Sequence, residues 1–578
     1  MFAMNWLNQK TPVWLTSGVL YGLAWPAFPI QTGWLAWFAL VPVLLRLRRV
    51  RSFGEHVRVT LPVFLVALPF VCWWLSYYSL LAMPMIWLTQ GPFIWVPMAL
   101  LYPVQKRIGW RKAMLLLPLF WAFWEWAWLY VCDFDLAVGG PGTTQANLLL
   151  VNQFADLTGV WGLIFWAIGF NVLLARVIDQ TEIQPLRQVG LRLAGVSALW
   201  LAGPLLYGWF VRAVPSTVIK SGLPPVHVGL LQTNEDPYAP LKPTTQADML
   251  RRLVALGTKA AKVKPEDLLP DRTQPSVARP DLIIAPEGAF PLPLLQDSAL
   301  FAGMRQYVQY YNVPFATGIM TPTDSTHYYN EAFVFTPELS RIYEPMGLKP
   351  GDLQVYRKQQ SLAFSERSPL LFRWADRWLR PGKPSVRLGD KPVAFTFTDQ
   401  KGNTRKLALA ICWEQIYPAT IAGLVRDETG QSPVEFLSFV MNDGWFYDSP
   451  GSRILLAFTQ LRAIENRRSI ARCSNQGYSG YVDPFGRIVS LLPRRAEAVG
   501  SVSMVANTKL SFFSRHPDWF PITCGLLWVV GILLGLRTAN KSIPSSFLTR
   551  STELPTLRYA VPPGQKQNDL HKIETPLS

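Results

Sequence analysis

The chain has 578 residues, of which 50% are hydrophobic, 13% aromatic and 16% charged. It is too long for one ordinary domain, and its composition is typical of a membrane protein that also carries one sizeable aqueous domain. The five cysteines form no CxxC pair and the five histidines no metal-ligand pattern, which disfavours a disulfide framework, a zinc site and a Cys/His dyad. No metal, nucleotide or organic cofactor signature appears, so we expect no cofactor.

Apolar stretches near the roughly 20 residues needed to cross a bilayer fill the first part of the chain. Together they predict an N-terminal membrane domain of about seven spans over residues 1–215 and a C-terminal transmembrane helix over 516–537. The stretches lie at roughly 12–28, 33–47, 60–82, 86–104, 113–131, 157–175, 193–211 and 519–536.

Basic residues between these stretches predict the orientation of the chain, because Lys and Arg are retained on the cytoplasmic side. They follow the second, fourth and sixth stretches, and the alternate connections contain none. An N-terminus and a C-terminus in the cytoplasm satisfy every short loop, which places the aqueous domain outside, and topology and anionic lipid explain the net charge of +17 better than nucleic acid does. The basic residues that predict the orientation are Arg46, Arg48, Arg49, Arg51, Arg58, Lys106, Arg107, Arg111, Lys112, Arg176, Arg187 and Arg192.

The polar tail over 538–578 is predicted to be disordered.

Residues 216–515 contain short β-rich runs that are nearly continuously apolar, as expected of strands buried on both faces. Helical patterns lie between them, at 247–261 and 453–468 among others. The fold class predicted for this part is therefore α/β, with sheet sandwiched by helices. The predicted strands are 226–232, 281–286, 315–320, 331–336, 406–412 and 435–441.

Three residues with complementary chemistry stand in or next to short motifs of this domain: Glu287 in APEGAF, Lys358 in VYRKQQ and Cys412 in ALAICWEQ. Glu287 and Cys412 come at or directly after the ends of apolar strands, where α/β folds gather their sites. A Cys sulfur needs a base to take its proton and a cation to favour negative charge. Alternatively, both residues have only a structural role, Glu287 as a capping carboxylate and Cys412 as a small buried thiol.

The order of these motifs resembles the nitrilase, or carbon–nitrogen hydrolase, superfamily. The later runs NDGWFYDSPG, QLRAIENRRS and SNQGYSGYVDPFGRI share the resemblance, and the hydrophobic stretches on both sides of the domain are similar to the apolipoprotein N-acyltransferase family of the bacterial inner membrane. This resemblance implies a nitrilase-like αββα sandwich in a multi-pass inner-membrane protein, with the catalytic domain in the periplasm.

Carried over by residue, the resemblance implies that Cys412 is the nucleophile, Glu287 the proton acceptor and donor, and Lys358 the cation that stabilises the oxyanion. Glu366, Glu414 and the backbone N–H of Trp413 would support them. The run around Glu366 reads SLAFSERSP where the family usually has Val-Pro-Phe-Gly-Glu, and tryptophan replaces a common tyrosine at 413.

The activity implied is transfer of a fatty acyl chain from a phospholipid to the α-amino group of the diacylglyceryl-cysteine of a lipoprotein, through a Cys412 thioester. The partners would be a phospholipid donor, a diacylated apolipoprotein acceptor and membrane lipids, without nucleic acid. Two alternatives stay open: a membrane-tethered amidase or nitrilase with the same triad, and a non-enzymatic membrane assembly protein with a degenerate outer domain.

One further segment, 369–383, interleaves aromatic and basic residues, which suits the headgroup layer of a membrane. An ordinary amphipathic surface helix is the equal alternative. The candidate residues for membrane or substrate contact are Phe372, Arg373, Trp374, Arg377 and Trp378.

Overall fold

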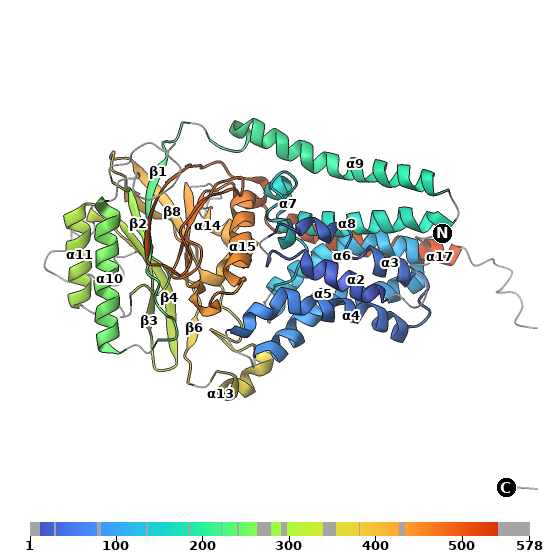
Figure 1. The fold of residues 1–578 in the computed structure, drawn as a ribbon, viewed down its shortest axis with the longest axis horizontal. Helices are drawn as coiled ribbons and strands as arrows, with labels where there is room; N and C mark the ends of the chain where they lie inside the picture. Colours follow the sequence, from blue (N-terminus) through green and yellow to red (C-terminus); the bar gives the residue numbers. More distant parts are fainter. Residues whose placement is uncertain are drawn as a thin grey trace, which may run out of the picture.

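A computed structural model describes the chain in two adjoining halves, a bundle of apolar helices and a domain of two β-sheets (Figure 1). Residues 542–578, where most of the predicted tail falls, lie outside the described part. The description covers residues 12–541 apart from 28–29, 78–81, 134–136, 183–184, 221, 240–241, 263–278, 291–297, 339–353, 381 and 427–433.

Each of the eight predicted apolar stretches contains a helix. Among the described residues, five helical segments are long and apolar enough to cross a membrane: Phe53–Tyr77, Trp110–Val131, Val160–Ile178, Arg187–Ala213 and Trp519–Thr538. The first two stretches form shorter helices. The helical half contains α2 (Val13–Leu23), η1 (Gly33–Trp37), α3 (Val41–Leu47), α4 (Phe53–Cys72), η2 (Trp73–Tyr77), α5 (Ala82–Ile108), α6 (Trp110–Val131), η3 (Thr143–Gln145), η4 (Asn152–Phe154), α7 (Ala155–Thr158), α8 (Val160–Ile178), η5 (Asp179–Glu182), α9 (Leu186–Ala213) and α17 (Trp519–Lys541).

Small residues let the first helices of the bundle pack closely. A Cβ added at Gly18 of α2 would lie 2.5 Å from the carbonyl oxygen of Val63 in α4, and one at Gly22 would lie 2.7 Å from Phe70. Ser52 caps the start of α4 by accepting a hydrogen bond from the Glu55 N–H. Helix α2 therefore lies directly on α4.

The second half contains two sheets. In the first, strands run in the order β13-β1-β2-β3-β4-β5 with β6 beside β4, and in the second the order is β12-β11-β10-β9-β8-β7. Strands β1, β2 and β3 are parallel to one another, as are β8, β9 and β10. The strands are β1 (Val226–Gln232), β2 (Leu282–Ile284), β3 (Phe315–Pro322), β4 (His327–Phe335), β5 (Val355–Arg357), β6 (Ser385–Arg387), β7 (Phe395–Thr398), β8 (Thr404–Ile411), β9 (Phe436–Met441), β10 (Ile470–Ser474), β11 (Gly480–Val482), β12 (Ile488–Leu491) and β13 (Ala498–Met504).

The two sheets pack face to face and helices cover their outer faces. Helices α10 and α11 lie outside the first sheet, and α15 lies between the second sheet and the helical bundle (Figure 1). The predicted nitrilase-like sandwich of helix, sheet, sheet and helix is confirmed. The helices of this half are α10 (Pro243–Lys262), α11 (Ser298–Tyr311), α13 (Asp376–Leu379), α14 (Pro418–Leu424), α15 (Gly451–Asn466) and α16 (Phe512–Arg515), with short turns η6 (Pro215–Thr217), η8 (Leu370–Ala375), η9 (Cys412–Ile416) and η10 (Asp443–Phe446).

Buried polar contacts join the two halves. At the end of α15, the guanidinium of Arg467 donates to Asp156 Oδ2 of α7 at 2.9 Å and to Gln153 Oε1 at 2.6 Å. Asp156 also accepts the hydroxyl of Tyr207 from α9 at 2.8 Å, and Glu465 accepts the N–H of Val160 at 2.8 Å. These contacts fix the sandwich against the bundle through α15.

Candidate active site

The three motif residues each directly follow a strand or lie close behind one. Cys412 follows β8 and Lys358 follows β5, while Glu287 comes shortly after β2. Strand β5 is antiparallel to β4, which is antiparallel to β3, so β2, β3 and β5 all point the same way. Residues after the carboxyl ends of such strands meet at one edge. The strand placement predicted for Glu287 and Cys412 is confirmed, and Lys358 joins them.

Glu287 is buried, and Asn330 of β4 holds its carboxyl group. Asn330 Nδ2 donates to Glu287 Oε1 at 2.8 Å. Burial raises the pKa of Glu287, and the nearby charge of Lys358 and the bond from Asn330 only partly oppose that shift. The Cys412 thiol lies near enough to this carboxyl group for each to shift the pKa of the other. A carboxyl group with a raised pKa beside a thiol suits the exchange of a proton between the two.

Lys358 is 1% exposed and its ammonium is paired with a carboxylate. Lys358 Nζ lies 2.6 Å from Glu366 Oε1, and Glu366 Oε2 accepts the backbone N–H of Leu362 at 2.7 Å. Burial lowers the pKa of Lys358, but the neighbouring acidic groups, Glu366 foremost, outweigh burial and raise it overall. The ammonium therefore stays charged at the site. Despite the unusual run around it, Glu366 contacts the lysine.

Cys412 begins the turn η9 in a strained backbone conformation. Its φ is 53°, in the left-handed region that a non-glycine residue rarely adopts. Such strain costs on the order of 1–3 kcal/mol and clusters at functional sites. Burial raises the pKa of the Cys412 thiol, as does the Glu287 carboxyl, while Lys358 lowers it. The resting sulfur is thus a neutral thiol, and a neighbouring base must remove its proton.

Glu414, buried two residues after the cysteine, ties the lysine loop to the cysteine loop. One carboxylate oxygen accepts the N–H of Gln359 at 2.6 Å and the hydroxyl of Tyr356 at 2.7 Å, and the other accepts the N–H of Ile411 at 2.7 Å. Burial raises its pKa to about 7. Lys358 forms its ion pair with Glu366. Glu414 therefore orients the lysine through the backbone N–H of the next residue, Gln359.

The other predicted residues take different positions. Trp413 is buried in η9 behind the cysteine. The aromatic and basic residues of 369–380 form the surface turns η8 and α13, where Phe372 packs on Phe364 with ring centroids 5.4 Å apart. Arg373 is exposed, and Arg377 lies over the ring of Trp378, 4.2 Å from its centroid.

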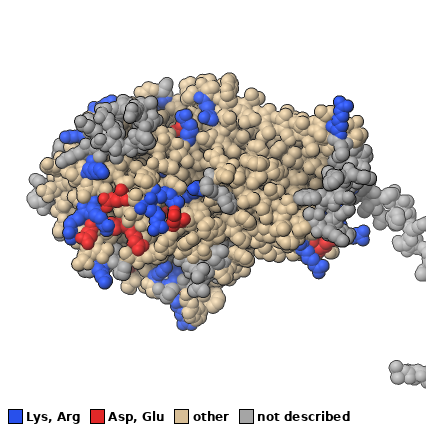
Figure 2. All heavy atoms as spheres, viewed as in Figure 1, with Lys and Arg blue, Asp and Glu red and all other residues tan. Residues whose placement is uncertain are grey.

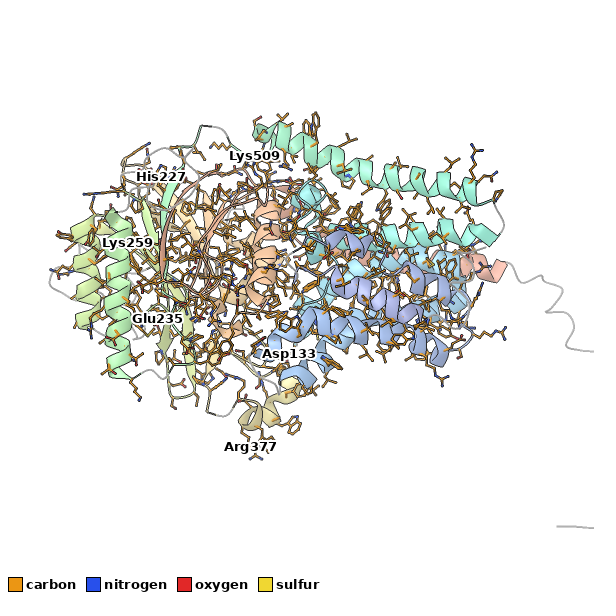
Figure 3. The ribbon with its side chains drawn as sticks, viewed as in Figure 1. Asp133, His227, Glu235, Lys259, Arg377 and Lys509 are labelled. Carbon is orange, nitrogen blue, oxygen red and sulfur yellow. The ribbon has the colours of Figure 1, made fainter. Side chains whose placement is uncertain are left out.

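This surface segment lies where the two halves meet. Trp374 is 72% exposed and Trp378 59% exposed. Arg367, just before the segment, donates to Asp133 at the end of α6 at 2.8 Å. Figure 3 labels Asp133 at the junction and Arg377 at the edge of the molecule. The exposed rings are thus placed beside the helical half.

Asn330 was missed by the sequence reasoning. It is the first residue of the run NEAFVF, where a polar residue ahead of an apolar strand is ordinarily the end of the strand and not part of a site. Its hydrogen-bond partner Glu287 is 43 residues away in the sequence, so no local pattern links the two. Among the described residues, no group of His, Cys, Asp and Glu side chains could hold a metal ion. The site is built from a carboxyl, an ammonium and a thiol that act on one another.

Comparison with known proteins identifies two regions. Residues 17–173 match the family model for the apolipoprotein N-acyltransferase N-terminal domain, and residues 275–508 match that for carbon-nitrogen hydrolase. An amidase structure from Nesterenkonia sp. is 15% identical with a TM-score of 0.33, over 52% of this chain and 97% of the amidase.

Full-length relatives agree with both regions. The apolipoprotein N-acyltransferase of Chlorobaculum tepidum is 32% identical over 90% of this chain and 96% of its own length. That of Geobacter metallireducens is 25% identical over 88% of this chain and 92% of its own length. The chain belongs to the apolipoprotein N-acyltransferase family.

Proposed function

We propose that this chain transfers a fatty acyl chain from a phospholipid to the α-amino group of the N-terminal diacylglyceryl-cysteine of lipoproteins, through a thioester on Cys412. The observation that carries the proposal is the meeting of Cys412, Glu287 and Lys358 at one edge of the sandwich, in a chain whose other half is an apolar helical bundle. Family membership supports the donor and acceptor.

The first half-reaction moves the acyl group to sulfur. Glu287 takes the proton of the Cys412 thiol, and the sulfur attacks the ester carbonyl carbon. Lys358 Nζ and the Trp413 backbone N–H stabilise the oxyanion, and such preorganised donors are worth about 3 kcal/mol each. The ester C–O bond breaks, Glu287 returns the proton to the departing alkoxide, and a lysophospholipid leaves.

The second half-reaction moves the acyl group to nitrogen. The amine of the acceptor attacks the thioester carbonyl, the C–S bond breaks, and Glu287 passes a proton from the nitrogen to the sulfur. Selection of an amine over water requires that water be scarce at the site. The burial of Glu287, Lys358 and Asn330 supports that condition.

The membrane topology belongs to the same proposal. We place the chain in a bacterial inner membrane with about eight spans, both termini in the cytoplasm and residues 216–515 in the periplasm, so that 1–215 and 516–537 form the membrane part and 538–578 a cytoplasmic tail. Figure 2 supports a band in the membrane, because on this face charged side chains gather over the sandwich and at the far end of the bundle, with few between. The basic loop residues support the orientation.

The aromatic and basic segment supports contact with the outer leaflet. The region that carries the exposed Trp374 and Trp378 is joined to the helical half by Arg367, which donates to Asp133, and in this topology the bilayer surface meets the sandwich there. Tryptophan rings favour that interface, and Phe372, Arg373 and Arg377 complete the segment.

The test is transfer between defined substrates. Purified protein is incubated with phospholipid that carries a labelled acyl chain in two reactions. The first contains a synthetic diacylated lipopeptide as acceptor, and the second contains water as the only acceptor. The proposal predicts label on the lipopeptide amine and release of lysophospholipid. Label found only as free fatty acid in both reactions, or hydrolysis of small amides at a higher rate, would favour a membrane-tethered hydrolase instead. No turnover of any acyl substrate would favour a non-enzymatic role.

A further inference from the structure

A groove at the outer face of α4 and α5 combines aromatic, apolar and basic side chains. Its volume is about 470 Å³, and it is open to the surroundings along the helix surface. Its wall pairs Phe53 with Tyr102, whose ring centroids are 5.7 Å apart, and Tyr102 is held by its hydroxyl, which donates to the Arg51 carbonyl at 2.9 Å. The groove is lined by Phe53, Ala99, Leu100, Tyr102, Pro103, Lys106 and Arg107.

Other arginines at this end of the bundle are neutralised by carboxylates that the structure describes. Arg46 pairs with Glu55 at 3.4 Å, and Asp179 pairs with both Arg48 and Arg111 at 2.5 and 3.2 Å.

Within the described residues, Lys106 and Arg107 have no carboxylate partner, and both are exposed. Lys106 lies over the Tyr102 ring, 5.5 Å from its centroid. Two uncompensated cations at the rim of an apolar groove favour an anion that carries apolar chains.

The groove is remote from the triad. The far end of α4 continues into η2, whose Trp74 packs on Phe446 of the sandwich with ring centroids 4.8 Å apart. Helix α5 runs back from that end over 27 residues, a length of about 40 Å. A phosphate at Lys106 is therefore about one bilayer thickness away from the sandwich. Its acyl ester cannot be the one that Cys412 attacks.

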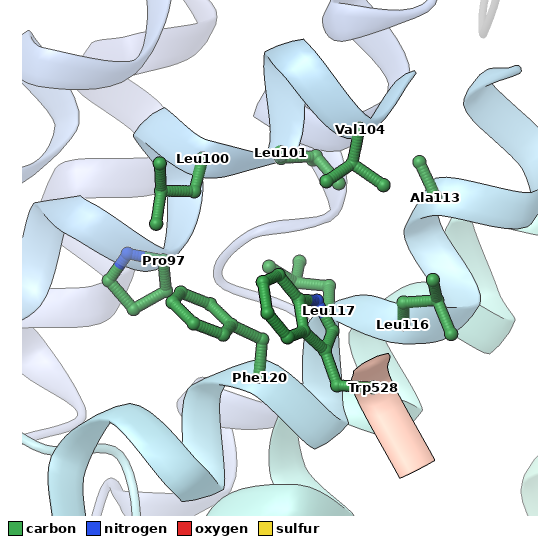
Figure 4. A pocket seen from close by; sticks show the side chains of 9 residues that line it. All are labelled: Pro97, Leu100, Leu101, Val104, Ala113, Leu116, Leu117, Phe120 and Trp528. Atoms are coloured by element: carbon green, nitrogen blue, oxygen red, sulfur yellow. The ribbon is translucent and has the colours of Figure 1, made fainter. Parts of the chain in front are cut away.

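An apolar crease on the other side of Leu100 extends the surface (Figure 4). It runs between α5, α6 and α17, and its lining contains no charged side chain. Phe120 and Trp528 pack at one side of it with ring centroids 4.6 Å apart. Leu100, 40% exposed, lies in both the groove and the crease. An acyl chain that leaves the groove would thus continue over hydrocarbon-like surface.

We propose that this groove binds an anionic phospholipid of the leaflet opposite the catalytic domain, with the headgroup phosphate at Lys106 and Arg107 and the acyl chains along Leu100. Charge complementarity selects the headgroup, because a zwitterionic lipid brings its own cation to the phosphate. This is a binding site separate from the donor site, so it stands or fails independently of the proposed acyl transfer.

Retention of lipid by the full chain tests the proposal. The protein is purified in detergent, mixed with phosphatidylglycerol or phosphatidylcholine, and analysed by native mass spectrometry and by thermal unfolding. We expect phosphatidylglycerol to be retained and to raise the unfolding temperature, and phosphatidylcholine to do neither. In the double variant Lys106→Gln/Arg107→Gln, retention should weaken about 30-fold, as expected for the loss of two charges near a lipid surface.

A matched control removes equal charge elsewhere on the bundle. Arg58→Gln/Arg187→Gln changes two exposed arginines outside the groove and should retain phosphatidylglycerol as the unmodified protein does. A second groove variant, Leu100→Trp, fills the site without changing charge and should also lose retention. A single symmetric peak in size-exclusion chromatography and an unchanged unfolding temperature without added lipid report that each variant is folded. Equal loss in the groove and control variants, or full retention in both groove variants, would overturn the proposal.

Discussion

Asn330 holds Glu287 in place through a hydrogen bond of 2.8 Å from its side-chain Nδ2 to Oε1, and its backbone carbonyl oxygen accepts the backbone N–H of Lys358 at 2.9 Å. The side chain and the backbone of one buried residue on β4 thus position the candidate base and the strand end that carries the candidate cation. The proposed proton transfer depends on that geometry.

We expect Asn330→Ala to slow acyl-enzyme formation about 10- to 100-fold, because a hydrogen bond to a charged group is lost. The bond stabilises the Glu287 carboxylate, so its loss should raise the pKa of Glu287 further and move the acid limb of the pH–rate profile to higher pH. Single-turnover acylation across pH measures both effects. Asn403→Ala, in a turn after β7, is the matched control, and an unshifted acid limb in Asn330→Ala would contradict this role.

Loss of the Glu366 charge should act on Lys358. In Glu366→Gln the ammonium loses the partner at 2.6 Å while staying buried, which lowers the pKa of Lys358 and frees its position. We expect acylation to fall about 100-fold in rate, with little change in apparent affinity for phospholipid. Glu497→Gln, an exposed carboxylate of the same domain, should leave the rate unchanged. A Glu366→Gln enzyme with normal rate would show that the pair is structural only.

Protonation of Glu414 should make stability depend on pH. Its pKa rises from an ordinary value of 4.5 to about 7 on folding, so the folded protein keeps a proton that the unfolded chain releases between these values. Stability therefore falls as pH rises through this window. Glu465, whose pKa burial also raises to about 7, contributes with the same sign. The unfolding temperature should decline less steeply with pH in Glu414→Gln. An equal slope would contradict the assignment.

The sequence predicts much of the sandwich because buried parallel strands appear as apolar runs. β1 (Val226–Gln232) coincides with its predicted range, and β9 begins one residue after its predicted start. Sequence periodicity does not reveal contacts between distant residues. The pair Arg467 and Asp156 is separated by 311 residues, and the apolar stretch at 86–104 gives no sign that its helix continues to Ile108 past Lys106.

The same limits explain the candidate site. Glu287, Lys358 and Cys412 stand out because their chemistry and their order along the chain are visible in the motifs. The pairing of Lys358 with Glu366 depends on how the loop after β5 folds back, so the sequence alone names Glu366 and Glu414 only as supporting residues and does not show which of them contacts the ammonium. The supporting role of each became distinguishable only through its hydrogen bonds.

The joint between the two halves should be sensitive to single changes. Arg467→Leu leaves Asp156 buried without its guanidinium partner, a loss that typically costs about 3–5 kcal/mol. We expect a lower unfolding temperature and weaker activity on lipid. The double variant Arg467→Leu/Asp156→Leu removes both charges and should recover part of the stability. If the double variant is less stable than the single one, the unpaired carboxylate is not the cause.

The most direct measurement is the chemistry of the covalent label on Cys412. After incubation with acyl-labelled phospholipid, the unmodified protein and the control Cys132→Ser should carry label that hydroxylamine removes, as a thioester requires. Cys412→Ala should carry none, and any label on Cys412→Ser should resist hydroxylamine as an oxygen ester. Hydroxylamine-sensitive label that persists in Cys412→Ala would contradict the account.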